Sequence, residues 1–146
     1  MKLLHYSFQP ITKLEAAEQS PGLTKPRGLW VSVGRAWAKW CEEESFRLGS
    51  VVNAVTLADD ANVLRIGNEA GMSRFQAQYG YEQFYSTYID WLGVARKYDG
   101  LIIAPYLYSS RLDRFWYYGW DCASGCIWQP RAVSDIRIEK TDGVRR

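Results

Sequence analysis

The chain has few of the residues that metal-dependent and histidine-dependent chemistries need. Its 146 residues include one histidine and three cysteines. The spacing of Cys122 and Cys126 is not that of a zinc ribbon, and one histidine leaves too few soft ligands for a zinc site. Together with Cys41 the thiols form no Cys-x-x-Cys redox pair. We therefore expect free, reduced cysteines and no bound metal.

Apolar stretches are also short. No run approaches the ~20 apolar residues of a membrane helix. The first residues lead at once into a histidine and polar residues, so no signal peptide is predicted. These two absences predict a cytoplasmic protein without a membrane partner.

Charge and glycine patterns exclude further classes. The 18 basic and 16 acidic side chains give a net charge of only +2. This balance provides no overall basic character of the kind that nucleic-acid-binding proteins concentrate on one face. A phosphate-binding loop and a Gly-x-Gly-x-x-Gly dinucleotide fingerprint are both absent from the sequence.

What is abundant is aromatic side chains. Seven Trp, ten Tyr and five Phe occur in a chain that is 47% hydrophobic and 23% charged. This composition and length predict one globular domain over residues 1–146. Large rings dominate core packing, and they also line clefts for flat ligands. Both interpretations apply to this chain.

Periodicity and turn residues predict an α+β fold with two or three helices packed on short strands. A stripe of aromatic and apolar residues favours a helix over 83–97, and Ser73 with Gln76 resembles a capping box for a shorter helix. Another helix is expected over 35–47, and the segment 106–121 is expected to be irregular. Strands are expected at 2–8, 29–33, 51–57, 63–66, 101–104, 126–128 and 133–138.

The first candidate site residue is His5, within the strand-like run Leu4–Ser7. A neutral imidazole donates from one nitrogen and accepts at the other. His5 is therefore suited to hold a ribose hydroxyl while Ser7 or a backbone group meets an amide. The alternative is a purely structural histidine.

The second candidate segment is Gly28–Ser32. Gly28 permits a close backbone approach, and Trp30 offers a flat face to a ligand. Trp37 and Trp40 follow on the predicted helix near the same end of the strand. Alternatively, Trp30 is an ordinary buried strand residue.

The order of these segments resembles the ADP-ribosyltransferase fold, in poly-ADP-ribose polymerases and diphtheria-type toxins. Two later runs are also similar to phage-borne and toxin members, namely Tyr98–Ile102 and Ile127–Val133. The resemblance implies split antiparallel sheets and NAD as co-substrate. In the family the histidine contacts the adenosine ribose and an aromatic residue stacks on nicotinamide; Trp30 takes that place here. The implied NAD-binding residues are His5, Tyr6, Ser7, Trp30, Ser32, Trp37 and Trp40.

The third family motif differs in this chain. The family places a glutamate at the start of the last motif's strand, where it binds the nicotinamide ribose and stabilises the transition state. Ser124 stands at that position, and no glutamate occurs between Glu82 and Glu139. Asp121 is the nearest carboxylate, although it also fits a turn or cap. We therefore name Asp121 and Ser124 as the catalytic candidates, with a non-catalytic binding or inhibitor protein as the alternative.

The segment 106–120 combines arginine with aromatic rings. Arg111, Arg114, Trp116 and Tyr117 are expected to form the surface that meets a macromolecular acceptor. Such a mixture stacks bases and pairs with phosphates, but it is equally typical of protein interfaces, so protein and nucleic acid both remain open. A partly buried loop is the third possibility. The resemblance implies transfer of ADP-ribose from NAD to this acceptor by a phage or toxin-like effector.

Overall fold

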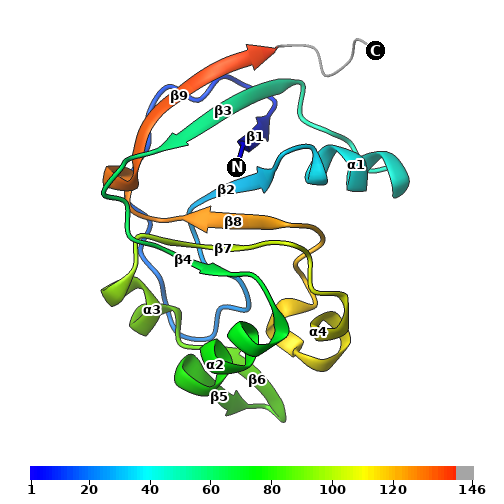
Figure 1. Cartoon of the computed structure of the whole chain (residues 1–146), viewed down its shortest axis with the longest axis vertical. Helices are drawn as coiled ribbons and strands as arrows, with labels where there is room; N and C mark the ends of the chain where they lie inside the picture. The colour runs from blue at the N-terminus through cyan, green and yellow to red at the C-terminus, as the bar shows by residue number, and fades with distance from the viewer. Residues whose placement is uncertain (141–146) are drawn as a thin grey trace.

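Seven strands form one sheet in the computed structural model, which describes residues 1–140. The strand order is β4-β7-β8-β2-β1-β3-β9, and only the β4–β7 pair is parallel (Figure 1). A second sheet consists of the β5–β6 hairpin. The strands are β1 (Leu3–Ser7), β2 (Leu29–Val33), β3 (Val51–Leu57), β4 (Val63–Ile66), β5 (Gly80–Gln83), β6 (Ser86–Ile89), β7 (Gly100–Ile103), β8 (Ser124–Ile127) and β9 (Val133–Lys140).

Four α-helices accompany these strands in residues 1–140. They are α1 (Ala36–Glu43), α2 (Glu69–Tyr79), α3 (Trp91–Lys97) and α4 (Tyr108–Asp113), with short 3-10 turns at Phe115–Tyr117 and Pro130–Ala132. Figure 1 shows α2, α3 and the hairpin together on one side of the β4–β7–β8 part of the sheet, and α1 beyond the end of β2. The predicted α+β class is confirmed.

The sheet separates two hydrophobic clusters. Strand β7 contributes to both, because successive side chains of a strand point to opposite faces. Leu101 and Ile103 pack in the larger cluster, where the rings of Trp91, Trp116 and other aromatic residues lie. Ile102 packs in the smaller cluster on the other face. All four residues of β7 are buried, as expected for a central strand covered on both sides.

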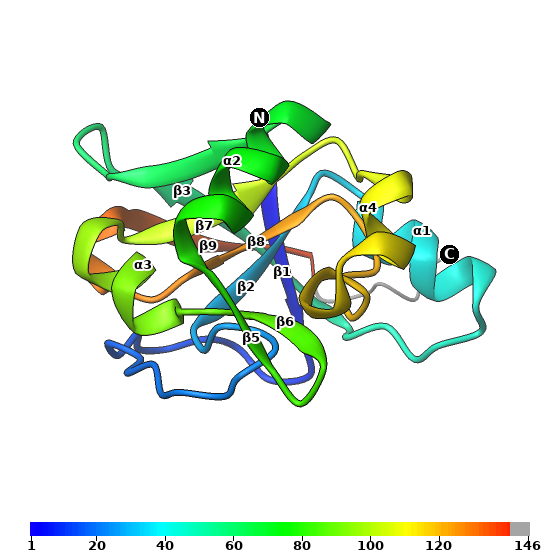
Figure 2. The ribbon, with the colours of Figure 1, turned by 90° about the horizontal axis from the view of Figure 1, so that it is seen from below.

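The helix predicted over 83–97 is only half correct. Residues 86–89 form strand β6, and a helix begins only at Trp91, after Asp90 accepts a hydrogen bond from the Gly93 N–H. Phe84 and Tyr85 form the two-residue turn between β5 and β6, and Figure 2 shows this hairpin extending away from the sheet. Both have positive φ, 53° and 63°, as a type I′ turn requires. Each costs about 1 kcal/mol or more in strain.

Two other local predictions were wrong. Helix α2 begins after Asn68, whose side chain accepts from the Gly71 N–H, so Ser73 and Gln76 lie inside the helix and do not cap it. The segment 106–121 contains α4 and a 3-10 turn, which raises the number of α-helices above the two or three expected. Among the helices in residues 1–140, none combines the length and apolar character needed to cross a membrane.

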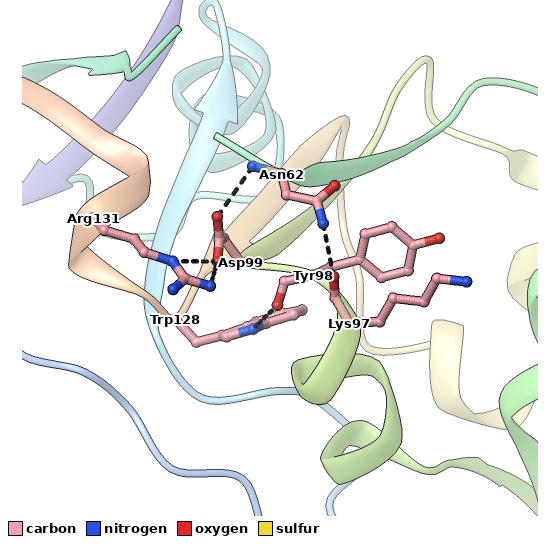
Figure 3. Close-up of polar contacts among 6 residues, drawn as sticks. All are labelled: Asn62, Lys97, Tyr98, Asp99, Trp128 and Arg131. Atoms are coloured by element: carbon pink, nitrogen blue, oxygen red, sulfur yellow. Dashed lines mark hydrogen bonds and ion pairs between the residues drawn. The ribbon is translucent and has the colours of Figure 1, made fainter. Parts of the chain in front are cut away.

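Buried Asp99 joins four segments at the junction of α3 and β7 (Figure 3). One carboxylate oxygen accepts from the Arg131 guanidinium at 3.0 and 2.8 Å, and the other accepts from the Asn62 N–H at 3.0 Å. Its backbone carbonyl accepts from the N–H groups of Trp128, at 3.0 Å, and Gln129, at 3.2 Å. Asp99 thus fixes the chain before β4 and after β8 to the start of β7.

Replacing Asp99 with alanine should therefore destabilise the fold. The Asn62 N–H and the Arg131 guanidinium would lose their buried, charged acceptor, and we expect the free energy of unfolding to fall by about 2–3 kcal/mol. Urea titration followed by tryptophan fluorescence measures this. Asp135→Ala is the matched control, because Asp135 is half exposed in a 3.5 Å pair with Arg137 and such pairs contribute below about 1 kcal/mol. Equal losses in the two variants would contradict the role of Asp99.

Candidate functional site

The sheet opens between β1 and β2. These strands pair only through Leu3↔Val33 and Leu4↔Ser32, whereas β1 stays paired with β3 along its whole length. A pocket of about 270 Å³ lies where β1 and β2 diverge. Strands β1, β2 and β8, the start of α1 and the segment before β8 all contribute to it. It is lined by Leu4, His5, Tyr6, Lys25, Trp30, Val31, Ser32, Trp37, Trp120, Asp121, Cys122 and Ser124.

His5 spans this opening. Its Nδ1 lies 2.6 Å from the backbone carbonyl oxygen of Trp30. A carbonyl only accepts, so Nδ1 carries the proton in this contact, and Nε2 of the neutral ring is left as an acceptor. The His5 carbonyl in turn accepts from the buried Asn53 side chain at 2.8 Å. The histidine is therefore held in one orientation, suited to accept a hydrogen bond from a ligand hydroxyl.

Aromatic rings form much of the pocket wall. Trp30 and Trp120 meet edge to face, with ring centroids 4.8 Å apart and planes at 71°. Trp37 stacks on Trp40 at 5.0 Å and 11°. Trp37 lines the pocket and Trp40 does not, so Trp40 supports Trp37 from behind. Of these two tryptophans, both named as candidate NAD-binding residues, only Trp37 thus lines the pocket.

Ser32 positions Trp37 through the start of α1. Its Oγ accepts from the Trp37 N–H at 2.9 Å and donates to the Gly34 carbonyl at 2.9 Å. Both hydrogen-bonding functions of the hydroxyl are used within the protein. Ser32 lines the pocket, and these bonds fix the turn that brings the indole of Trp37 to it.

Gly28 allows the segment before β2 to lie directly on β8. Its φ is 154°, and an added Cβ would stand 2.5 Å from the Ile127 carbonyl oxygen and 2.9 Å from the Cys126 sulfur. A side chain here would force the segment away from β8. This close approach brings Lys25 to the pocket, with its Nζ 5.3 Å from the centroid of the Trp30 ring. Among the lining residues, Lys25 is the one lysine or arginine.

Asp121 is the one carboxylate that lines the pocket. No hydrogen bond or ion pair to its side chain is formed within residues 1–140, which leaves the carboxylate open to a ligand. Ser124, at the start of β8, offers only a hydroxyl, which donates to the Cys122 carbonyl at 2.9 Å. The pocket thus combines one anion, one cation and one histidine with three indole rings.

Seven of the sequence-predicted site residues meet in this pocket: His5, Tyr6, Trp30, Ser32, Trp37, Asp121 and Ser124. Ser7 does not line it. The Ser7 hydroxyl donates to the Gln9 carbonyl at 2.7 Å and accepts from the Asn53 side chain at 3.1 Å. Ser7 therefore ties β1 to β3 and to the chain that follows it.

The predicted acceptor surface is partly wrong. Trp116 and Tyr117 are fully buried in the larger hydrophobic cluster, because the 3-10 turn directs both rings inward. Arg114 is half-buried and donates to the hydroxyls of Ser110 and Ser73 at 3.1 and 3.0 Å. Arg111 lies over the ring of Tyr118, with its guanidinium carbon 5.0 Å from the centroid.

Outside the candidate segments Leu4–Ser7 and Gly28–Ser32, three lining residues escaped the sequence prediction, namely Lys25, Trp120 and Cys122. Lys25 had a usable signal, since it lies three residues before Gly28 at the entry to a predicted site strand. Trp120 and Cys122 flank the predicted Asp121, but nothing in their own pattern separates pocket lining from core packing.

The thiols near the pocket are poor nucleophiles. Burial, reinforced by the negative charge of Asp121, raises the pKa of Cys122 to about 11. Burial also raises the pKa of Cys41, with Asp121 again contributing, and raises that of Cys126. Because thiolates are the reactive form, this environment opposes cysteine nucleophilic catalysis. Within residues 1–140, no cluster of three or more metal-ligating side chains occurs.

Comparison of the chain with models of protein families, with curated proteins and with solved structures gives no match. The interpretation of the pocket therefore depends on its own residues and geometry.

Cys122 should react slowly with a thiol reagent in the folded protein. A pKa of about 11 instead of the ordinary 9.0 lowers the thiolate fraction near neutral pH by about 100-fold. The unfolded chain should lose this proton first, so the contribution of Cys122 to stability should decline as pH rises from 9.0 toward 11. Mass-resolved labelling with iodoacetamide, with and without urea, measures the first effect. If Cys122 is labelled as fast in the native protein as in urea, the predicted slow reaction of the folded protein is wrong.

Proposed function

We propose that the pocket binds NAD and that the protein transfers ADP-ribose from NAD to a macromolecular acceptor. The observation that carries the proposal is the convergence of His5, Trp30 and Asp121 on one pocket. These residues lie far apart in the sequence, on β1, on β2 and just before β8. The opening of the sheet between β1 and β2 also supports an ADP-ribosyltransferase-like fold with split sheets.

The groups of the pocket match the parts of NAD. Nε2 of His5 accepts from a hydroxyl of the adenosine ribose. The nicotinamide ring stacks on Trp30, because a cationic ring is attracted to the face of an indole. Lys25 lies over Trp30 in the structure, and the entering ring displaces its ammonium toward the pyrophosphate. Trp37 forms the opposite aromatic wall.

The reaction breaks the bond between the nicotinamide nitrogen and the ribose anomeric carbon. The bonding electron pair leaves with nicotinamide, which becomes neutral, and positive charge develops on the ribose. The Asp121 carboxylate stabilises this charge at short range in a partly buried site. A nucleophilic atom of the acceptor then bonds to the anomeric carbon, and its proton passes to Asp121 or to solvent.

Ser124 argues against catalysis. A hydroxyl at the start of β8 provides no negative charge to the developing cation. If Asp121 does not reach the ribose, the pocket binds NAD without breaking it, and the protein acts as a binding or inhibitor protein. Binding and turnover therefore need separate measurements.

Asp121→Asn should abolish nicotinamide release while leaving NAD affinity within about threefold, because the amide keeps the shape and loses the charge. We expect turnover to fall by about 100-fold or more. Nicotinamide release is followed by chromatography with NAD and a cell extract as the acceptor source, and affinity by calorimetry. Asp60→Asn, in an exposed turn, is the matched control. Unchanged turnover in Asp121→Asn would remove Asp121 from the mechanism.

Lys25→Ala should weaken NAD binding by about tenfold, because the ammonium contributes a charge-assisted contact to the pyrophosphate. Adenosine, which has no phosphate, should bind both proteins equally. Lys39→Ala removes an exposed lysine of α1 that does not line the pocket and should have no effect. Equal losses of affinity for NAD and for adenosine would show that the substitution disturbs the fold of the pocket and does not remove a contact with the phosphates.

A further inference from the structure

A second groove lies between the β5–β6 hairpin and α4. Its volume is about 330 Å³, and its apolar lining comes from Tyr85, Leu112, Phe115 and Tyr118. Leu112 is 82% exposed, and Phe115 and Tyr118 are about half exposed. Solvent-facing apolar side chains gathered around one groove are typical of a protein-docking surface.

The hairpin tip adds to this surface. Phe84 and Tyr85 occupy the turn with positive φ, where asparagine and glycine are favoured. Phe84 is 77% exposed and Tyr85 is fully exposed. Two strained, solvent-facing rings contribute little to the packing of the free protein. Such strain is a feature of ligand-contacting segments.

Both walls of the groove are held in place. The ring of Tyr88 on β6 packs against Phe115 at 5.4 Å. Glu69 of α2 accepts hydrogen bonds from the hydroxyls of Ser109 and Ser110 in the first turn of α4. The groove is therefore present before any partner binds, which lowers the entropy cost of docking.

The charges of the groove select the partner. Glu82 and Asp113 line it, and neither forms an ion pair within residues 1–140. Arg111 also lines it, but its guanidinium lies over the ring of Tyr118. With Arg111 counted, the lining residues carry two negative charges and one positive charge, and this negative excess favours arginine or lysine over the phosphates of a nucleic acid.

The groove and the pocket share one chain segment. Tyr118 lines the groove, and Trp120 and Asp121 line the pocket. Gly119 between them lies against Lys25, whose Cε would stand 3.1 Å from a Cβ at Gly119. A chain docked in the groove therefore lies beside the pocket.

We propose that this groove docks a protein segment in which an apolar side chain is flanked by arginine or lysine. It follows that the acceptor of the transfer is a protein; this last step rests on the proposed function, whereas the docking itself does not.

A displayed library of random peptides is the probe, selected on the intact protein. We expect enrichment of peptides that combine a large apolar residue with adjacent arginine or lysine. A labelled copy of one selected peptide should bind at least about tenfold more weakly to Tyr85→Ser and Leu112→Ser, and Asp113→Lys should weaken it similarly. Tyr108→Ser is the matched control, because Tyr108 is an exposed tyrosine of α4 that does not line the groove.

Enrichment of acidic peptides, no enrichment at all, or binding that Tyr85→Ser and Leu112→Ser leave unchanged would overturn the proposal. Oligothymidine is tested as a nucleic-acid probe. If it binds the protein and Tyr85→Ser abolishes that binding, the groove is a nucleic-acid site and the proposal is overturned as well. Thermal unfolding confirms that each variant is folded. An NAD titration of the same variants separates the two proposals. Peptide binding without NAD binding would refute the proposed function and support the docking surface. NAD binding without peptide binding would refute the docking surface and support the proposed function.

Discussion

Asp99 is the buried charge around which the ends of several strands are arranged. Its carboxylate satisfies Arg131 and the Asn62 N–H, and its carbonyl satisfies the N–H groups that follow β8. A buried carboxylate is tolerated only when its oxygens are fully used, so these segments have little freedom to move apart. The edge strand β4, the central strands β7 and β8 and the turn before β9 all take their relative positions from this junction. The pocket lies at the far end of β8, on a support that Asp99 helps to fix.

The strands were predictable from the sequence because their signals are local. Apolar runs bounded by glycine, proline and aspartate placed β2, β3, β4 and β7 within a residue or so of their observed ends. The first half of the helix predicted over 83–97 was wrong because Phe84, Tyr88 and Trp91 have helical spacing, yet Phe84 and Tyr88 belong to a hairpin. No turn residue marks this hairpin, since Phe84 and Tyr85 adopt a backbone conformation that usually signals itself with asparagine or glycine.

The site was predictable where residues lie on strands that the sequence defines. His5 and Trp30 could each be placed on a predicted strand, and in the structure the antiparallel pairing of these strands brings both residues to one opening. The place of Lys25 before Gly28 was a signal in the sequence, but its contact with the pocket depends on how closely Gly28 approaches Ile127 in the folded protein. Trp116 and Tyr117 were misplaced for a related reason. A run of arginine and aromatic residues does not say which rings a 3-10 turn will direct inward.

The opening between β1 and β2 lowers the stability of the sheet and at the same time provides the space for the pocket. Two continuous strands would hydrogen-bond along their full length, whereas here two residue pairs and the imidazole of His5 connect them. Substitutions that closed the opening would strengthen the sheet and remove the pocket, so improved stability here would come at the expense of recognition.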